Sequence, residues 1–479
     1  MIIMRYNKSF KYIIPLGICL AAVSCTPALA PLAETKAVPE SFDKSTDTTN
    51  TSTIPWRTYF KDPNLVNLID TALKNNQELQ ITLQEVEIAK NDIRVRKGAL
   101  LPSVGIGAGA GIEKVGRYTS QGAGDASTEI KPGKEMPDPL GDLKIAAYAH
   151  WEVDIWKKLR NSKKAAVSRY LSTVEGKNFV ITNLISEVAD SYYELLALDS
   201  QLEIVRKTIE LQSNALEVVK IQKEAARTTE LAVQKFQAEV LASKSMEFDI
   251  LQNIKETENK INFLLGQYPQ EIKRDKSNFM NLMPSVINSG IPSQLLANRP
   301  DIKQAELELE AAKLDVKVAR AEFYPSLDIT AAIGVNAFNP SYLFTLPESL
   351  LYSLAGDLAA PLINRNAIKA EYSSANARQL QALYNYERTI LNAYLEVSTQ
   401  LSKINNLEKS YDLKSQQVVA MNRSIDVAGD LFKSAKADYF EVLMTQRDAL
   451  ESKLELIDTK KEQLNASVLV YRDLGGGWK

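Results

Sequence analysis

Cysteine and histidine are almost absent from this chain. Its 479 residues include two cysteines and one histidine. Cys19 lies within an N-terminal apolar leader and Cys25 lies at its end, so a processed chain would keep at most one thiol. This excludes an intrachain disulfide and leaves too few ligands for a typical zinc or thiol site. We therefore expect no metal site and no cofactor.

The sequence also lacks the common signatures of enzymes and of nucleic-acid-binding proteins. Carboxylates are abundant, for example at Glu306, Glu308 and Glu310, but they occur at ordinary helical spacing. No nucleophile–base pair, glycine-rich phosphate loop or metal-ligand spacing accompanies them. The formal net charge is only −2, whereas nucleic-acid-binding domains are usually strongly basic. We expect neither catalysis nor a nucleic-acid partner.

Proline is missing from two long stretches. None occurs between Leu140 and Tyr268, and none from Leu362 to the C-terminus. Such stretches favour helices far longer than the usual 11–12 residues. At about 1.5 Å per residue, ~65 residues following Ile155 would form a helix of roughly 100 Å.

The N-terminus has the features of a bacterial export signal. Basic residues precede a short apolar run from Tyr12 to Val23, which predicts a signal peptide over residues 1–24. Ala22–Cys25 resembles a lipobox, so we expect cleavage before Cys25 and lipidation of its thiol. An ordinary signal peptide cleaved near residues 28–30 is the alternative. Residues 25–55 are rich in Thr, Ser, Pro and Ala and predict an extended tether.

A helix followed by a strand occurs twice in the chain. Residues 299–334 align without a gap with residues 76–111. In each copy a helical pattern ends near a Pro-Ser pair, and the apolar period then changes to two. We expect strands at about 103–112 and 326–336, and a first helix from roughly Asn64 to Leu101.

Each of these strands is followed by a second one. Alternation predicts returning strands at about 143–154 and 349–359. His150 falls on the polar face of the first, where a solvated side chain is expected rather than a ligand. Residues 113–140, rich in Gly, Ser, Thr and Pro, are expected to contain neither helix nor strand.

Two series of apolar residues at heptad spacing predict long helical hairpins. The second series repeats the first at a constant displacement of 209 residues: Val188, Leu195, Leu202, Ile209 and Leu216, then Val397, Ile404, Tyr411, Val418 and Ile425. The chain therefore divides into a first repeat at 56–269, a linker at 270–298 and a second repeat at 299–479.

Four strands are too few for a closed membrane barrel. The smallest such barrels have about eight strands, and an unpaired sheet edge is excluded from lipid. Either the strands pack on helices of their own chain, or several chains contribute strands to one barrel. The small and charged residues of the polar face favour a wet lumen, and thus the second arrangement.

Four short motifs resemble one family. They are Leu295–Ile302 (LLANRPDI), Phe323–Leu327 (FYPSL), Trp151–Trp156 (WEVDIW) and Leu264–Gly266 (LLG). Together with the duplication, they make the chain similar to the TolC/OprM-type outer-membrane efflux channels, in their lipoprotein (NodT-like) branch.

The resemblance implies a fold that is mainly α with a membrane β-barrel part. Duplicated helix–strand–strand–helical-hairpin units would form a homotrimer with a 12-stranded barrel and a long periplasmic α-helical barrel. It also implies a location in the outer membrane of a Gram-negative bacterium, with a lipid anchor. A periplasmic adaptor (membrane fusion) protein and an inner-membrane pump of the resistance-nodulation-division (RND) type would be its partners.

The resemblance also suggests a gate and a contact surface at the hairpin tips. Glu441 corresponds to an acidic ring that narrows the pore in such channels, with Asp438 and Met444 beside it. The residues expected to contact the adaptor are Ala226, Arg227, Thr228, Thr229, Ala435, Lys436 and Ala437. The alternative for Asp438 and Glu441 is an ordinary solvated helix surface near a turn.

The implied function is that of a passive conduit that exports small toxic molecules in a tripartite efflux system. An outlet for a type I protein secretion system is the alternative within the channel class. A coiled-coil surface lipoprotein without a pore is the alternative from another class.

Overall fold

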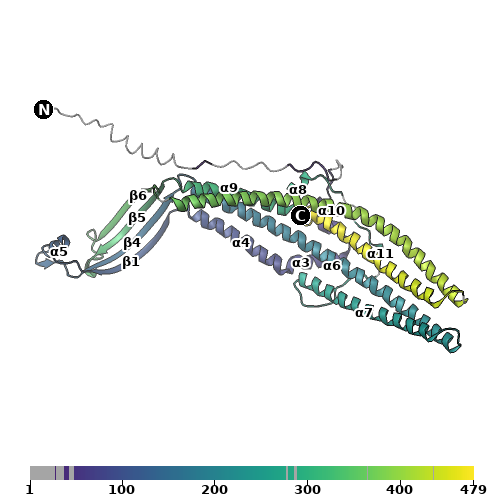
Figure 1. The fold of residues 1–479 in the computed structure, drawn as a ribbon. Coiled ribbons are helices and arrows are strands. Elements are labelled where there is room, and N and C mark those ends of the chain that lie inside the picture. Colours follow the sequence, from purple (N-terminus) through teal and green to yellow (C-terminus); the bar gives the residue numbers. More distant parts are fainter. Residues whose placement is uncertain are drawn as a thin grey trace. The chain divides into compact units, whose positions relative to one another are not determined.

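The computed structural model describes residues 27–28, 37–42, 48–276, 279–284, 288–363, 365–434 and 436–478. The signal peptide, Cys25 and Ala435 lie outside the described residues. The chain forms two compact units (Figure 1). Among the described residues, the strand unit contains the segments Ile88–Tyr170 and Leu307–Leu383, and the hairpin unit contains those from Asn50 to Glu87, from Leu171 to Glu306 and from Tyr384 to Trp478. Each unit combines segments of both sequence repeats.

The strand unit contains a four-stranded antiparallel sheet. Its strands are β1 (Ser103–Glu113), β4 (Leu140–Val153), β5 (Ser326–Ala337) and β6 (Leu350–Ala359), in the order β1-β4-β5-β6. The central β4–β5 pair joins the two repeats, with Ala149 opposite Ala331. The outer strands β1 and β6 each have one neighbour within the described part of the chain.

The strand register places the apolar side chains of all four strands on one face. Val104 pairs with Ala149, Ala149 with Ala331, and Ala331 with Leu354. This face does not pack on helices of its own chain, because Ile106 is 84% exposed and Leu354 is 79% exposed. The structure therefore excludes one of the two arrangements that the sequence left open, in which the strands pack on helices of their own chain.

The expectation that residues 113–140 lack regular structure was wrong. The segment contains helix α5 (Ser120–Asp125) and a small hairpin of β2 (Glu129–Lys131) and β3 (Lys134–Glu135). Thr119 caps the helix by accepting a hydrogen bond from the Gly122 N–H. Gly133, with φ +78°, forms the hairpin turn. The residues that favour a loop also supply helix caps and tight turns.

The predicted first helix is two helices, α3 (Pro63–Asn75) and α4 (Gln77–Gly98). Asn76 interrupts them with extended backbone (φ −60°, ψ 126°). Its side-chain oxygen accepts from the Leu79 N–H, which starts a new helix. The prediction of a single helix from Asn64 to Leu101 was therefore wrong. From the sequence alone, an asparagine that caps a new helix is hard to distinguish from an asparagine within a helix.

The helices confirm the duplication. Helices α4 and α9 (Pro300–Ala321) both have 22 residues, and α7 (Glu230–Leu264) and α11 (Tyr439–Asp473) both have 35. The long helices α6 (Lys158–Glu224) and α10 (Asn366–Lys433) have 67 and 68 residues. The shorter elements are η1 (Thr51–Thr53), α2 (Trp56–Tyr59), η2 (Phe279–Asn281), α8 (Ser293–Asn298) and η3 (Pro340–Tyr342).

The core of the hairpin unit follows the predicted heptads. Val188, Leu195 and Leu202 are buried in its largest apolar cluster, together with Tyr192 and Tyr471. Among the described residues, none of the helices combines the length and the apolar character needed to cross a membrane. The division into signal peptide, tether, repeats and linker stays a prediction.

Candidate functional site

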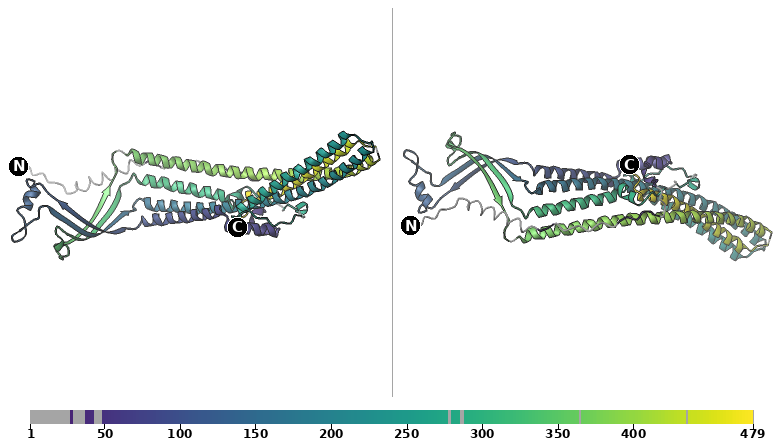
Figure 2. Two further views of the ribbon diagram at one scale, coloured as in Figure 1. Left: turned by 90° about the horizontal axis from the view of Figure 1, so that it is seen from below. Right: turned by 90° about the horizontal axis from the view of Figure 1, so that it is seen from above.

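The turns of the two helical hairpins lie at the same end of the hairpin unit (Figure 2). After α6, the chain turns through Ala226 in the left-handed region, with φ +55°. The Arg227 N–H donates to the Gln222 carbonyl at 2.8 Å, and the Lys436 N–H donates to the Leu431 carbonyl at 2.9 Å. The same hydrogen bond thus closes both hairpins, as expected of duplicated turns.

The two tips pack against each other through an apolar cluster. Val219, Val233 and Phe236 from the first hairpin contact Val442 and Leu443 from the second. At the same place the Lys235 ammonium group lies 5.1 Å from the centroid of the Phe440 ring, a cation–π contact between α7 and α11. The structure therefore brings the two predicted tip segments together.

Most of the predicted adaptor-contacting residues are accessible. Ala226, Arg227, Thr229 and Lys436 are exposed, whereas Thr228 and Ala437 are half-buried. The Thr229 side chain accepts a hydrogen bond from the Ala232 N–H and thereby caps α7. Thr229 therefore has a structural role in starting the helix, whether or not it meets a partner.

The predicted gate residues begin α11. Asp438 is its N-cap residue, but its side chain makes no capping hydrogen bond. Glu441 lies in the first turn, where a negative charge is stabilised by the helix dipole. Both carboxylates are exposed, Met444 is half-buried, and no described cation forms an ion pair with Glu441.

The first hairpin lacks acids at the matching positions. At the displacement of 209 residues, Thr229 matches Asp438 and the buried Ala232 matches Glu441. The acid in the first turn of α7, Glu230, pairs with Lys223, and a hydrogen bond from that lysine lowers the pKa of Glu230. Among the described residues, acids without an ion-pair partner at the start of a return helix therefore occur only in the second hairpin.

A buried charged cluster was missed by the sequence reasoning. Arg299 donates from Nη1 to Glu396 at 2.8 Å, and from Nη2 to Asp301 at 2.7 Å. Burial lowers the pKa of Arg299, but the hydrogen bond and charge of Asp301 and the charge of Glu396 outweigh it, so that pKa is raised. The LLANRPDI motif marks this position, but its sequence gives no indication of the distant partner Glu396.

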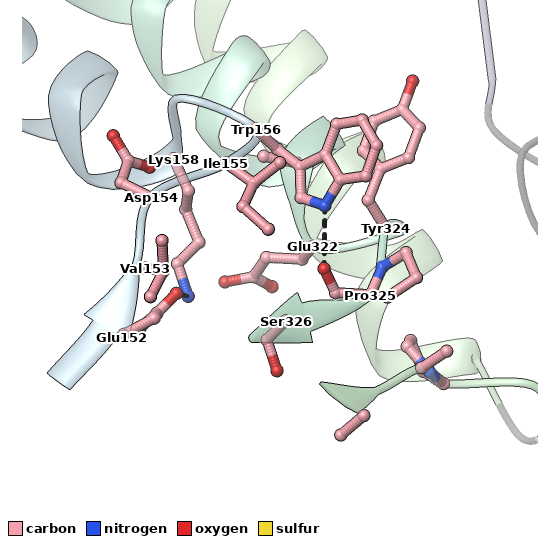
Figure 3. A pocket seen from close by; sticks show the side chains of 14 residues that line it. Glu152, Val153, Asp154, Ile155, Trp156, Lys158, Glu322, Tyr324, Pro325 and Ser326 are labelled. Atoms are coloured by element: carbon pink, nitrogen blue, oxygen red, sulfur yellow. Dashed lines mark hydrogen bonds and ion pairs between the residues drawn. The ribbon is translucent and has the colours of Figure 1, made fainter. Parts of the chain in front are cut away.

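A second pair of motifs meets at the junction of strands and helices (Figure 3). A pocket of about 430 Å³ is lined by Trp156, Tyr324 and Pro325, among others. Trp156 donates from Nε1 to the Pro325 carbonyl at 2.7 Å, and its ring stacks on Tyr324 with centroids 4.6 Å apart. WEVDIW and FYPSL thus hold together the ends of β4 and α9, which is a structural role.

The matching family model is described as "Outer membrane efflux protein" and covers residues 68–267 and 291–476. The chain is 28% identical over 474 residues to the "Pyoverdine export outer membrane protein OpmQ" of Pseudomonas aeruginosa, covering 98% of both chains. It is 27% identical over 474 residues to the "Cation efflux system protein CusC" of Escherichia coli O6:H1. This match covers 98% of this chain and 99% of CusC. The solved open state of the MtrE outer membrane channel of Neisseria gonorrhoeae matches with a TM-score of 0.82 at 21% identity, over 95% of this chain and 99% of that one.

Proposed function

Because the chain belongs to the outer membrane efflux protein family, we propose that three copies form one channel that a periplasmic adaptor connects to an inner-membrane RND-type pump. The family, the predicted fold class, the outer-membrane location and the efflux function are confirmed. The chain is an outer-membrane efflux channel. The family is one of channels rather than of enzymes, and we propose that this chain is a passive conduit without a catalytic step.

The observation that carries the trimer is the incomplete sheet. Strands β1 and β6 are its two edges, and the apolar face is exposed across all four strands. In lipid, unpaired N–H and C=O groups at an edge cost several kcal/mol each. Pairing β1 of one copy with β6 of the next removes both edges, and three copies supply twelve strands, within the range of membrane barrels.

Native mass spectrometry and planar-bilayer recording of the detergent-extracted channel test this assembly. We expect a trimer that produces single-channel currents. A stable monomer without conductance would contradict the proposal and would favour a surface lipoprotein that forms no pore.

We propose that Cys25 is lipidated after cleavage of residues 1–24. The supporting observation is the lipobox-like sequence Ala22–Cys25, which follows a short apolar run. Mass spectrometry of the mature N-terminus is expected to find a diacylglyceryl thioether and an acylated amine on Cys25. An unmodified N-terminus near Ala28 would show cleavage by an ordinary signal peptidase instead.

We propose that Glu441 lines the constriction of the channel, with Asp438 and Met444 next to it. Three exposed carboxylates converging on one axis would repel each other and attract cations. Among the described residues, only the second hairpin has acids without an ion-pair partner at the start of its return helix, which supports this assignment. Helix capping does not require such acids, since the acid in the first turn of α7, Glu230, is paired with Lys223.

The neutral variant Glu441→Gln tests the constriction because it keeps the shape of the side chain. We expect higher single-channel conductance or a weaker preference for cations, with a smaller effect of Asp438→Asn. Glu451→Gln, exposed on the same helix, is the matched control and should leave both properties unchanged. Equal behaviour of the Glu441 and Glu451 variants would remove Glu441 from the constriction.

We propose that the tip residues 226–229 and 435–437 contact the adaptor. Most of those described are exposed, and the apolar cluster behind them keeps the two turns together. A photo-crosslinking amino acid at Arg227 or Lys436 should capture the adaptor in cells, whereas the same group at exposed Lys244 should not. Equal capture at all three positions would contradict this assignment.

The cargo that we propose is small solutes rather than proteins. Two relatives are named for the export of pyoverdine and of cations, which are both small. Deleting the gene should sensitise the host to small toxic compounds and leave protein secretion intact. Loss of a secreted protein without any change in drug or metal sensitivity would instead identify a type I secretion outlet.

A further inference from the structure

A second pocket of the strand unit is distinguished by its charge. Its volume is about 610 Å³, and it lies among the end of α4, the first turns of α6 and the helix α9. The residues that line it are Leu100, Lys157, Arg160, Asn161, Lys163, Lys164, Val167, Ser168 and Leu314. Four of these are basic and none is acidic.

Most of this positive charge has no counterion in the described part of the chain. Arg160 is engaged by Asp154, through Nε to the carboxylate at 2.8 Å and through Nη2 to the main-chain carbonyl at 2.5 Å. Lys157, Lys163 and Lys164 have no such partner among the described residues. Like charges gathered at one pocket repel each other, and an anion bound there would remove this repulsion.

The duplication provides an internal comparison for these lysines. The first seven residues of α6 are KLRNSKK, with four basic residues and no acid. The first seven residues of α10 in the second repeat are NAIKAEY, with one lysine and one glutamate. The helix start therefore does not require the basic cluster, since the equivalent helix begins without one.

The lining of the pocket also has an apolar part. Leu100, Val167 and Leu314 contribute to its lining. Trp151, on the apolar face of β4, donates from Nε1 to the Leu100 carbonyl at 3.2 Å. Since β4 ends at Val153, four residues before Lys157, the pocket lies where the membrane strands pass into the periplasmic helices.

We propose that this pocket binds the headgroup phosphate of an anionic phospholipid from the periplasmic leaflet of the outer membrane. The three lysine ammonium groups would contact the phosphate, and the acyl chains would lie toward Leu100 and the apolar face of the sheet. Basic pockets at the edge of a membrane-spanning region bind anionic lipid headgroups in this way. The proposal uses the outer-membrane location of the family but not the trimer or the gate.

Native mass spectrometry of the purified full-length channel, incubated with phosphatidylglycerol or phosphatidylcholine, tests the site. The test variant combines Lys157→Asn, Lys163→Gln and Lys164→Gln, with asparagine at position 157 because the backbone there has φ +62°. With each lysine contributing about fivefold, the variant should bind phosphatidylglycerol about a hundredfold more weakly. Binding of phosphatidylcholine should stay weak in both proteins.

The matched control replaces three exposed lysines of the hairpin unit, Lys244, Lys273 and Lys409, by glutamine. It loses the same charge and should bind phosphatidylglycerol as the wild type does. If the control lost as much binding of phosphatidylglycerol as the test variant, or if the test variant lost none, the proposed site would be overturned. Displacement of the lipid by millimolar inorganic phosphate would overturn the lipid as its ligand. Both variants should conduct in bilayers, so a failure of this proposal is distinct from a failure of the channel.

Discussion

The guanidinium of Arg299 donates from Nη1 to the main-chain carbonyl of Asp473, 3.0 Å away. The first repeat contains the same contact with a different residue: Asn76 donates from Nδ2 to the carbonyl of Leu264, also at 3.0 Å. Asn76 matches Arg299 in the repeat alignment, and Leu264 matches Asp473. In both repeats a side chain at the start of one helix thus binds the end of the return helix, but only the second contact is charged.

We predict that Arg299→Ala is more destabilising than Asn76→Ala. Removing the guanidinium leaves Asp301, Glu396 and the Asp473 carbonyl without their cation, which costs about 3–5 kcal/mol. Removing the Asn76 amide leaves the Leu264 carbonyl unpaired, which costs about 1–3 kcal/mol. It also removes the N-cap hydrogen bond from Leu79, which adds about 1 kcal/mol. Denaturant midpoints of the solubilised channel, followed by helical circular dichroism, measure the difference. A larger loss for Asn76→Ala would contradict the importance of the charged cluster.

We predict that Ala226→Gly stabilises the tip of the first hairpin. Ala226 has φ +55°, which costs a non-glycine residue about 1–2 kcal/mol, and glycine loses part of this gain through its freedom in the unfolded chain. The net gain of about 0.5–1 kcal/mol should slow amide exchange at the end of α6 roughly two- to fivefold. Exposed Ala242→Gly, within α7, should instead accelerate exchange around it. Faster exchange in both variants would show that the turn does not favour glycine.

We predict that stability decreases as the pH rises toward 7 because of Asp190. Burial raises the pKa of Asp190 to about 7, Arg472 and Lys260 partly offset this effect, and Glu187 and Glu462 add to it. The folded chain then binds more protons than the unfolded chain, whose aspartate has a pKa of about 3.9. The free energy of unfolding should fall by about 2 kcal/mol between pH 5.5 and 8, and the effect ends above the folded pKa.

Asp190→Asn should remove this dependence and raise stability at pH 8, because the neutral side chain needs no proton. Asp249→Asn, at an exposed position of α7, is the control and should keep the wild-type pH profile. Unfolding midpoints at both pH values measure the difference. An unchanged slope in Asp190→Asn would assign the pH dependence to another group.

We predict that Gly334→Ala impairs the barrel, whereas Gly109→Ala is tolerated. A Cβ atom at Gly334 would lie 2.2 Å from the Ile145 carbonyl oxygen and 2.5 Å from the Ala146 Cα, both backbone atoms of β4. A Cβ atom at Gly109 would meet no atom within 4 Å. Gly334→Ala should cost about 1–3 kcal/mol and reduce the yield of assembled channel on semi-native gels. Normal assembly of Gly334→Ala would show that β4 and β5 separate easily at this point.

The elements that the sequence predicted well are those set by local periodicity. The strands follow from alternation of apolar and polar residues, which in β1 and β5 begins after a Pro-Ser pair. Helices α6, α7, α10 and α11 follow from heptads and from the absence of proline. The errors occurred where one residue type serves two purposes. Asn76 begins a new helix instead of continuing one, and the Gly- and Thr-rich segment before β4 contains caps and turns of real elements.

The candidate sites likewise combine local features that the sequence predicted with long-range features that it did not. The positions of Asp438 and Glu441 at the start of α11 could be predicted, because a hairpin break and a helix start are local features. The absence of an ion-pair partner for these two acids among the described residues could not be predicted, since it depends on which side chains of other helices lie nearby. The Arg299 cluster and the basic pocket were not found, because each depends on residues that are far apart in the sequence: Glu396 completes the cluster, and Leu100 and Leu314 complete the pocket.

By itself, the sequence determined the duplication, the length of the helices and the single apolar face of each strand, because each depends on spacing along the chain. Only the tertiary structure decided that the apolar faces of four strands coincide and remain uncovered, and which charged groups keep a partner. These properties depend on strand register and helix packing, which bring together residues more than a hundred positions apart, such as Trp151 and Ile329.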